Sequence, residues 1–117
     1  MTNSQNNPSD IKQDQYLPVF LSTDKSKILL VGGGAIAVAK LRLIADFAED
    51  VTIIAKDLHD EIRVLAASKN LKIIEAEFSS KQLVGFDIVV AATDDAKVNT
   101  EISKYATEAN ILVNVVD

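Results

Sequence analysis

The chain has 117 residues, of which 48% are hydrophobic and 25% are charged, and its formal net charge is −5. This apolar content suffices for the core of one ordinary domain, whereas the negative charge and the scattered Lys and Arg residues exclude nucleic-acid binding as a primary function. The absence of cysteine excludes disulfides and thiolate metal sites and is typical of a cytoplasmic protein.

Residues 1–15 are rich in Asn, Gln, Ser and Asp, a composition that predicts a disordered tail. They lack the apolar stretch of a secretory signal peptide. No apolar run in the chain approaches the roughly 20 residues that a membrane helix needs, so we expect no membrane association. One domain is therefore predicted over residues 16–117, and its first segment, 16–21, is extended, with Pro18 suited to an edge position.

Strands and helices are predicted to alternate along this domain. Apolar runs predict strands over 27–31, 51–55, 71–78, 86–92 and 111–116. Helical periodicity predicts helices over 35–47, 57–70 and 94–110, with a short polar turn or helix at 79–83. The alternation implies right-handed βαβ crossovers. The predicted fold class is therefore α/β, a Rossmann-like doubly wound parallel sheet with strand order 3-2-1-4-5.

Two of the predicted helices have apolar stripes that we expect to face the sheet. In the first helix the stripe consists of Ile36, Ala39, Leu43, Ile44 and Phe47. In the last helix it consists of Val98, Ile102, Tyr105 and Ala109.

The segment after the first strand, Gly32-x-Gly34-x-x-Ala37, has the spacing of a dinucleotide-binding turn. In such a turn Gly32 permits the tight bend, Gly34 lets the backbone approach a pyrophosphate, and Ala37 allows close packing of helix on strand. Gly33 completes the turn, and the N-terminus of the following helix offers N–H groups to phosphates. The alternative is a tight turn without a ligand, but the position between a strand and a helix favours a nucleotide.

The acidic residue that binds a cofactor ribose is expected about 20 residues after the glycines, where Lys56 and Asp57 follow the second strand. Asp57 is able either to accept the ribose hydroxyls or to cap the second helix. Lys56 leaves room for a 2′-phosphate. The mechanics of the sequence therefore do not separate NAD from NADP.

Further polar residues follow the fourth and fifth strands. Thr93 or Asp94 is expected to cap the last helix, and contact with the nicotinamide side of a cofactor would be an additional role. Asp117 follows the fifth strand and is either a solvated aspartate or a proton acceptor that faces the nicotinamide. The single histidine, His59, is expected to be an exposed helix residue, and the chain offers neither a metal site nor a Ser-His-Asp arrangement.

Taken together, "YLPVFL", "ILLVGGGAIAVAKLRL", "VTIIA", "VVAATDDAKVN" and "ILVNVVD" resemble the N-terminal domain of the siroheme synthase family. This family contains the precorrin-2 dehydrogenases and sirohydrochlorin ferrochelatases. The resemblance runs from Tyr16 to the last residue. It implies an NAD-dependent oxidation of precorrin-2 to sirohydrochlorin and, in bifunctional members, insertion of ferrous iron to give siroheme.

The resemblance also implies roles for particular residues. It implies NAD contacts at Ala35, Ile36, Lys56 and Asp57, with Thr93 and Asp94 beside them. Asp117 falls on the aspartate thought to act in both dehydrogenation and chelation. Family members continue beyond "NVVD" into a dimerisation region and a helical part, so we expect a homodimer for the longer protein and little turnover by these 117 residues alone. The family commonly has a glycine after the first helix, whereas this chain has Ala48, Glu49 and Asp50 there.

Two other functions stay open at this point. A regulatory Rossmann module that senses NAD(H) would bind the nucleotide without redox chemistry, and it gives no reason for "NVVD". A degenerate structural domain would bind nothing.

Overall fold

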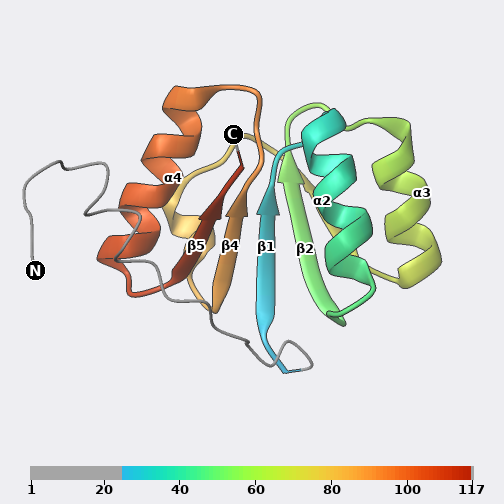
Figure 1. Cartoon of the computed structure of the whole chain (residues 1–117), viewed down its shortest axis with the longest axis horizontal. Coiled ribbons are helices and arrows are strands. Elements are labelled where there is room, and N and C mark those ends of the chain that lie inside the picture. The colour runs from blue at the N-terminus through green and yellow to red at the C-terminus, as the bar shows by residue number, and fades with distance from the viewer. Residues whose placement is uncertain (1–24, 117) are drawn as a thin grey trace, which may run out of the picture.

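The computed structural model describes residues 25–116, which form a parallel sheet covered by helices on both faces (Figure 1). The strands are β1 (Lys27–Val31), β2 (Asp50–Ala55), β3 (Lys72–Glu75), β4 (Ile88–Ala91) and β5 (Leu112–Val115). The helices are α2 (Ala35–Ala45), α3 (Asp60–Lys69), α4 (Ala96–Glu108) and the short 3-10 helix η1 (Ser80–Leu83). The predicted tail at 1–15, the extended segment at 16–21 and Asp117 lie outside the described residues.

The sheet has the strand order β3-β2-β1-β4-β5, and all neighbouring strands are parallel. This confirms the predicted α/β fold class and the predicted order 3-2-1-4-5. Val31 at the end of β1 pairs with Ile54 on one side and with Ala91 on the other. The carboxyl ends of the strands therefore meet at one edge of the sheet, and the strand order reverses between β1 and β4.

The sheet is buried on both faces because its strands alternate between two apolar cores. In β1, Ile28 and Leu30 belong to the core under α2 and α3, whereas Leu29 and Val31 belong to the core under α4 and η1. Figure 1 shows α2 and α3 together over one half of the sheet and α4 over the other half. Burial on both sides is the physical reason for the continuous apolar run that predicted this strand.

The two edge strands are more exposed than the central ones. β3 covers Lys72–Glu75, within the predicted 71–78, and β5 covers Leu112–Val115, within 111–116. Each has a neighbour on one side only among the described residues, so fewer ladder hydrogen bonds extend it. Leu112 keeps 54% of its surface exposed, whereas Leu29 in β1 is fully buried.

The predicted stripe of α2 is confirmed in part, because Ile36 and Ile44 pack against the core, but the fully buried face is a different one. Ala37, Val38 and Leu41 are buried, whereas Leu43 is 56% exposed and Phe47 is 67% exposed. Apolar residues surround most of this helix, so their spacing is compatible with more than one buried face. The fully buried Ala37 lets the helix approach the sheet closely, as its place in the glycine motif predicts.

The predicted stripe of α4 is also confirmed in part, because Val98 packs against the core and Ile102 is buried in it. Asn99, Ile102 and Ala106 are buried, whereas Tyr105 is 38% exposed and Ala109 is exposed. The physical reason is the amide of Asn99, which turns inward to form hydrogen bonds at the end of β4 that are described below.

Two helix N-caps differ from those expected. The cap of α3 is His59, whose Nδ1 accepts a hydrogen bond from the Glu61 N–H at 3.2 Å, so His59 is not a helix-interior residue and Asp57 is not the cap. The backbone N–H of His59 donates to the Gly33 carbonyl at 2.7 Å, which delays the start of the helix. The cap of α4 is Asp95, whose Oδ1 accepts from the Lys97 N–H at 2.9 Å, rather than Thr93 or Asp94.

The chain leaves β1 through Gly32, which adopts a φ of +137°, a conformation that residues with side chains rarely adopt. A Cβ atom at this position would lie 2.2 Å from the carbonyl oxygen of Ala92, which follows β4. The turn therefore requires glycine at position 32 for two independent reasons, as the dinucleotide motif predicts.

We expect Gly32→Ala to lower the free energy of unfolding by about 3 kcal/mol, because it adds both backbone strain and a clash with the Ala92 carbonyl. Urea unfolding followed by circular dichroism measures this change. The matched control is Gly34→Ala, where φ is −98° and an added Cβ meets nothing within 4 Å. The control should change the stability by less than about 1 kcal/mol. Equal stabilities of the two variants would contradict the prediction.

Candidate nucleotide-binding site

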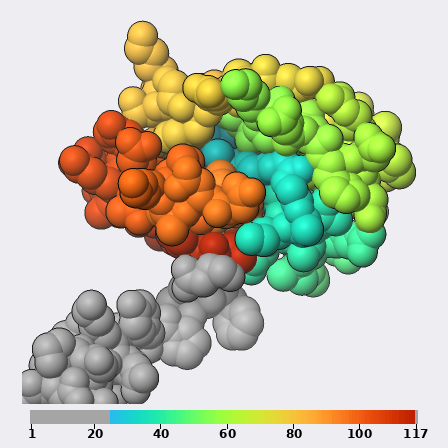
Figure 2. All heavy atoms as spheres, turned by 90° about the horizontal axis from the view of Figure 1, so that it is seen from above, coloured from blue at the N-terminus to red at the C-terminus, as the bar shows by residue number. Residues whose placement is uncertain are grey.

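The carboxyl edge of the sheet gathers three loops that carry predicted cofactor-binding residues. The glycine turn follows β1, Lys56 and Asp57 follow β2, and Thr93 and Asp94 follow β4. Figure 2 looks onto this edge, and the start of α2 (cyan) reaches the surface between α4 (orange) and α3 (green). In open α/β sheets ligands bind at this edge, where the strand order reverses.

Gly33 holds the turn against the loop after β2. A Cβ atom on Gly33 would lie 2.0 Å from the Asp57 carbonyl oxygen and 2.8 Å from the Ala55 Cβ. The Gly33 carbonyl in turn accepts the hydrogen bond from the His59 N–H. The absence of a side chain at Gly33 therefore brings the loop that contains Asp57 into contact with the glycine turn.

Gly34 leaves the N-terminus of α2 open. It is the N-cap residue, it provides no side-chain hydrogen bond, and the first turn of the helix contains no acidic residue. The N–H groups of Ala35 and Ile36 lie in this first turn, where the helix itself supplies no acceptor. An added Cβ on Gly34 would meet nothing within 4 Å, so there is space in front of these donors. Such an N-terminus fits an anionic group such as a pyrophosphate.

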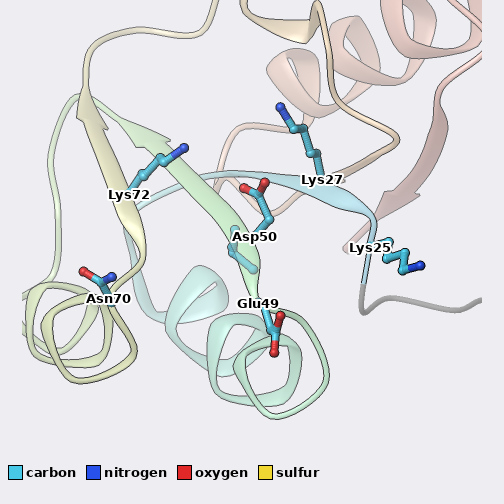
Figure 3. A pocket seen from close by; sticks show the side chains of 7 residues that line it. Lys25, Lys27, Glu49, Asp50, Asn70 and Lys72 are labelled. Atoms are coloured by element: carbon cyan, nitrogen blue, oxygen red, sulfur yellow. The ribbon is translucent and has the colours of Figure 1, made fainter.

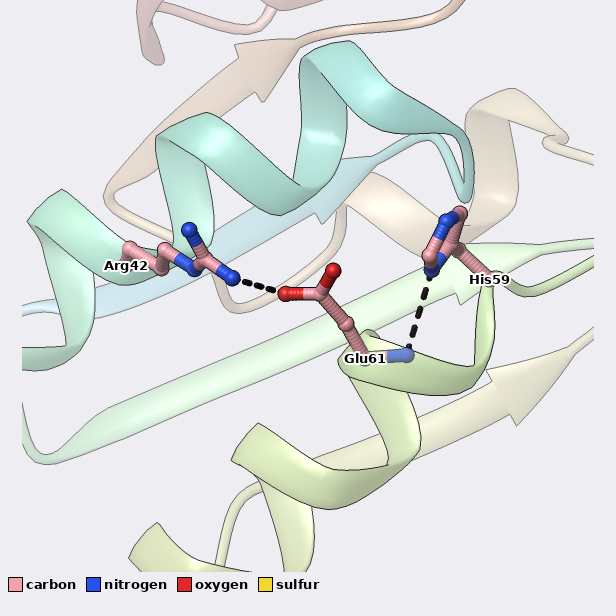
Figure 4. Close-up of polar contacts among 3 residues, drawn as sticks. All are labelled: Arg42, His59 and Glu61. Carbon is pink, nitrogen blue, oxygen red and sulfur yellow. Dashed lines mark hydrogen bonds and ion pairs between the residues drawn. The ribbon is translucent and has the colours of Figure 1, made fainter.

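An ion pair joins the last turn of α2 to the first turn of α3. Figure 4 shows the guanidinium of Arg42 directed at the carboxylate of Glu61, whose backbone N–H donates to His59. The Arg42 and Glu61 side chains are 59% and 47% exposed, so the pair adds little to stability. It does connect the helix that starts at the glycine turn to the helix that starts after Asp57.

The loop after β2 carries one paired and one unpaired charge. Lys56 Nζ lies 3.5 Å from the Oε1 atom of Glu77 in the segment after β3. The carboxylate of Asp57 is exposed and has no hydrogen-bond or ion-pair partner within residues 25–116. Because His59 caps α3, the Asp57 carboxylate is available to a ligand.

The loop after β4 is organised by Asn99, a residue that the motif analysis did not single out. Asn99 Oδ1 accepts hydrogen bonds from the Thr93 N–H at 3.2 Å and from Thr93 Oγ1 at 2.6 Å. Asn99 Nδ2 donates to the Thr93 carbonyl at 3.1 Å. The sequence does contain a signal for this role, because Asn99 is a polar residue directly after Val98 and three residues before Ile102, two members of the predicted apolar stripe of α4. Asp94 is exposed and, as far as the structure describes the chain, its carboxylate has no partner.

The predicted catalytic residue, Asp117, lies outside the described residues, so its role stays a prediction. The residue before it, Val116, donates its N–H to the Ala91 carbonyl at 2.9 Å. The pairing of β5 with β4 therefore continues to the residue that precedes Asp117.

A polar depression of about 390 Å³ lies at the opposite edge of the sheet, at the amino ends of β1, β2 and β3. Figure 3 shows the side chains that line it, among them Lys25, Glu49, Asp50 and Lys72. The lining mixes both signs of charge and lies away from the glycine turn.

Neither a clustered metal site nor a membrane-spanning helix occurs within residues 25–116. In this part of the chain no three His, Cys, Asp or Glu side chains are grouped so that they would hold a metal ion. None of its helices combines the length and the apolarity needed to cross a bilayer.

Comparison with known proteins matches residues 19–117 to a family model described as "Putative NAD(P)-binding". Siroheme synthase 3 of Aeromonas hydrophila is 42% identical over 102 residues, which are 87% of this chain and 22% of that protein. The siroheme synthase of Nitrosococcus oceani is 37% identical over 103 residues, which are 88% of this chain and 22% of that protein. This chain thus spans about a fifth of the length of these relatives.

A solved structure of SirC, a precorrin-2 dehydrogenase, matches with a TM-score of 0.76 and 25% sequence identity. The match covers 86% of this chain and 50% of the SirC chain. The family model, the relatives and the fold all agree with the motifs at the carboxyl edge of the sheet. The chain therefore belongs to the NAD(P)-binding Rossmann domain family of the siroheme synthases and SirC.

Proposed function

We propose that this chain binds NAD and is the cofactor-binding part of a precorrin-2 dehydrogenase, which oxidises precorrin-2 to sirohydrochlorin in siroheme biosynthesis. The observation that carries the proposal is the open N-terminus of α2, uncapped and without an acidic first turn, at the point where the strand order reverses. The names of the relatives, siroheme synthase and precorrin-2 dehydrogenase, supply the substrate class.

In this proposal the glycine turn binds the pyrophosphate. Gly34 admits the phosphates to the backbone, and the N–H groups of Ala35 and Ile36 donate to them. The unpaired carboxylate of Asp57 accepts the hydroxyls of the adenosine ribose. Lys56 pairs with Glu77 at the exposed surface, where such a pair is weak, so the preference for NAD over NADP rests on Asp57 and on the resemblance to the siroheme synthases.

The same strand-order reversal divides the cofactor between the two halves of the sheet. With the adenosine half over β2, the nicotinamide half lies over β4, next to Thr93 and Asp94. This half is where a substrate would meet the cofactor.

Oxidation of precorrin-2 removes a hydride and a proton. Bound NAD supplies the hydride acceptor. We propose that the Asp117 carboxylate accepts the proton, because Asp117 comes two residues after β5 in the sequence and β5 ends at the carboxyl edge of the sheet. If the whole protein also inserts ferrous iron as a substrate, the two pyrrole N–H protons released by sirohydrochlorin need an acceptor, and Asp117 is our candidate for that role too.

The siroheme synthases and SirC extend well beyond the part that this chain matches. We propose that the tetrapyrrole cleft needs residues from that additional part and from a second subunit of a homodimer. The 117 residues alone are then expected to bind NAD but to turn over little precorrin-2.

We expect Gly34→Val to abolish NAD binding, because its side chain would occupy the space in front of the α2 N–H groups. Isothermal titration calorimetry on the 117-residue chain measures the affinity. The surroundings of Gly34 are open, so the variant should keep its fold, which circular dichroism checks. An unchanged NAD affinity in a folded Gly34→Val would remove the glycine turn from the site.

We expect NAD to bind more tightly than NADP and Asp57→Asn to weaken NAD binding by about tenfold, the loss expected for a hydrogen bond to a charged group. The matched control is Asp60→Asn, which changes an exposed carboxylate in the first turn of α3. Titration with both dinucleotides tests the claim. Tighter binding of NADP than of NAD would overturn it and would point to Lys56 as a phosphate ligand.

We expect Asp117→Ala to leave NAD affinity nearly intact while it lowers precorrin-2 oxidation by roughly 10²–10⁴-fold, the range for a lost general base. The assay uses a chimera in which residues 16–117 replace the matching segment of the Aeromonas hydrophila siroheme synthase. Asp117→Asn separates loss of the proton acceptor from loss of side-chain volume. Oxidation by the Ala variant at the rate of the unsubstituted chimera would remove Asp117 from the mechanism.

A further inference from the structure

Asn99 joins α4 to the loop that follows β4 through a single side chain. Its amide forms hydrogen bonds with the N–H, the hydroxyl and the carbonyl of Thr93. We propose that Asn99 is a positioning residue, which holds this loop in the conformation that binds the nicotinamide half of the dinucleotide. The inference rests on the NAD-binding function proposed above.

The burial of Asn99 supports this role. Within residues 25–116 the buried polar side chains are those of Thr52 and Asn99, and Asn99 is only 6% exposed. A buried amide destabilises the fold unless it is hydrogen-bonded. The three atoms that form hydrogen bonds with the Asn99 amide all belong to Thr93, so the amide orders this loop residue specifically.

The loop that Asn99 orders also forms one wall of the glycine turn. Ala92 precedes Thr93 and donates its N–H to the Val31 carbonyl at 2.8 Å. The Ala92 carbonyl oxygen would lie only 2.2 Å from a Cβ atom on Gly32. Thr93 therefore lies on the β4 side of the glycine turn, the side that faces the nicotinamide half in the proposed function.

These hydrogen bonds assign different roles to neighbouring residues. The polar groups of Thr93 are engaged by Asn99, and the Thr93 hydroxyl oxygen also accepts from the Asp95 N–H at 3.2 Å. Thr93 thus acts as the anchored residue of the loop, and Asp94 beside it presents an exposed carboxylate to a ligand. Asp95 caps α4.

The helix has other anchors, so the expected effect of Asn99 is local. Ile102 and Ala106 are fully buried against the sheet, and the Asp95 cap fixes the start of α4. Loss of the Asn99 amide should therefore release the loop rather than displace the helix. Such a release affects the ligand half over β4 and spares the half over β2.

The test compares NAD with ADP, which carries the adenosine and the pyrophosphate but no nicotinamide. We expect Asn99→Leu and Asn99→Asp to weaken NAD binding by about tenfold, with less than a twofold change for ADP. Thr100→Ala is the matched control, because among residues 25–116 the Thr100 hydroxyl donates to the Ala96 carbonyl of the same helix and has no other partner. It should leave both affinities unchanged. Calorimetry supplies the affinities, and urea unfolding identifies a variant that has lost its fold.

Asn99→Asp keeps an oxygen acceptor for the Thr93 N–H and hydroxyl, so it carries the test if the Leu variant fails to fold. Hydrogen exchange at the Thr93 amide provides a second measurement, and it should quicken in a folded Asn99→Leu, which removes the acceptor of that N–H. Unchanged NAD affinity, or equal losses for NAD and ADP, would overturn the positioning role and leave the proposed function standing. Failure of the unsubstituted chain to bind NAD would overturn both.

Discussion

The structure depends on the close approach of three backbone segments at the carboxyl edge of the sheet. Gly32 meets the Ala92 carbonyl after β4, and Gly33 meets the Asp57 carbonyl after β2, at separations that leave no room for a Cβ atom. Two adjacent residues without side chains thus bring three loops of different strands to one place. The residues proposed to bind the pyrophosphate, the ribose and the nicotinamide come from these loops.

The apolar core makes this convergence rigid. Leu29, Ile53 and Val89 lie in the middle of β1, β2 and β4 and are fully buried, so the strands that end at the site are held by packing on both faces. The ion pairs near the site are exposed and contribute at most about 1 kcal/mol each. Stability therefore comes from the sheet, while the loops at its edge are left to recognise a ligand.

The three long helices divide their N-termini between structure and function. His59 caps α3 and Asp95 caps α4, so side chains satisfy N–H groups in those first turns. Gly34 is the N-cap residue of α2 but has no side chain to accept hydrogen bonds, which leaves N–H donors for an anion at the strand-order reversal. A side-chain cap and a bound phosphate compete for the same N–H groups. The missing side chain at Gly34 is thus the feature from which the proposed function follows.

The sequence by itself determined the alternation of strands and helices, the strand order and the conformational role of Gly32, because each follows from local periodicity, crossover handedness or one residue's allowed φ. The cofactor contacts stay predictions based on the motifs. Only the tertiary structure decided which faces of α2 and α4 are buried and that His59 and Asp95 are the caps. The spacing of apolar residues could not decide which of two neighbouring helix faces is buried when most of the helix is apolar. The N-caps could not be predicted because several adjacent polar residues are able to accept the hydrogen bond of a helix N-terminus. The inward turn of Asn99 was decided the same way, since its partner Thr93 lies six residues away and meets it only when α4 packs on the sheet.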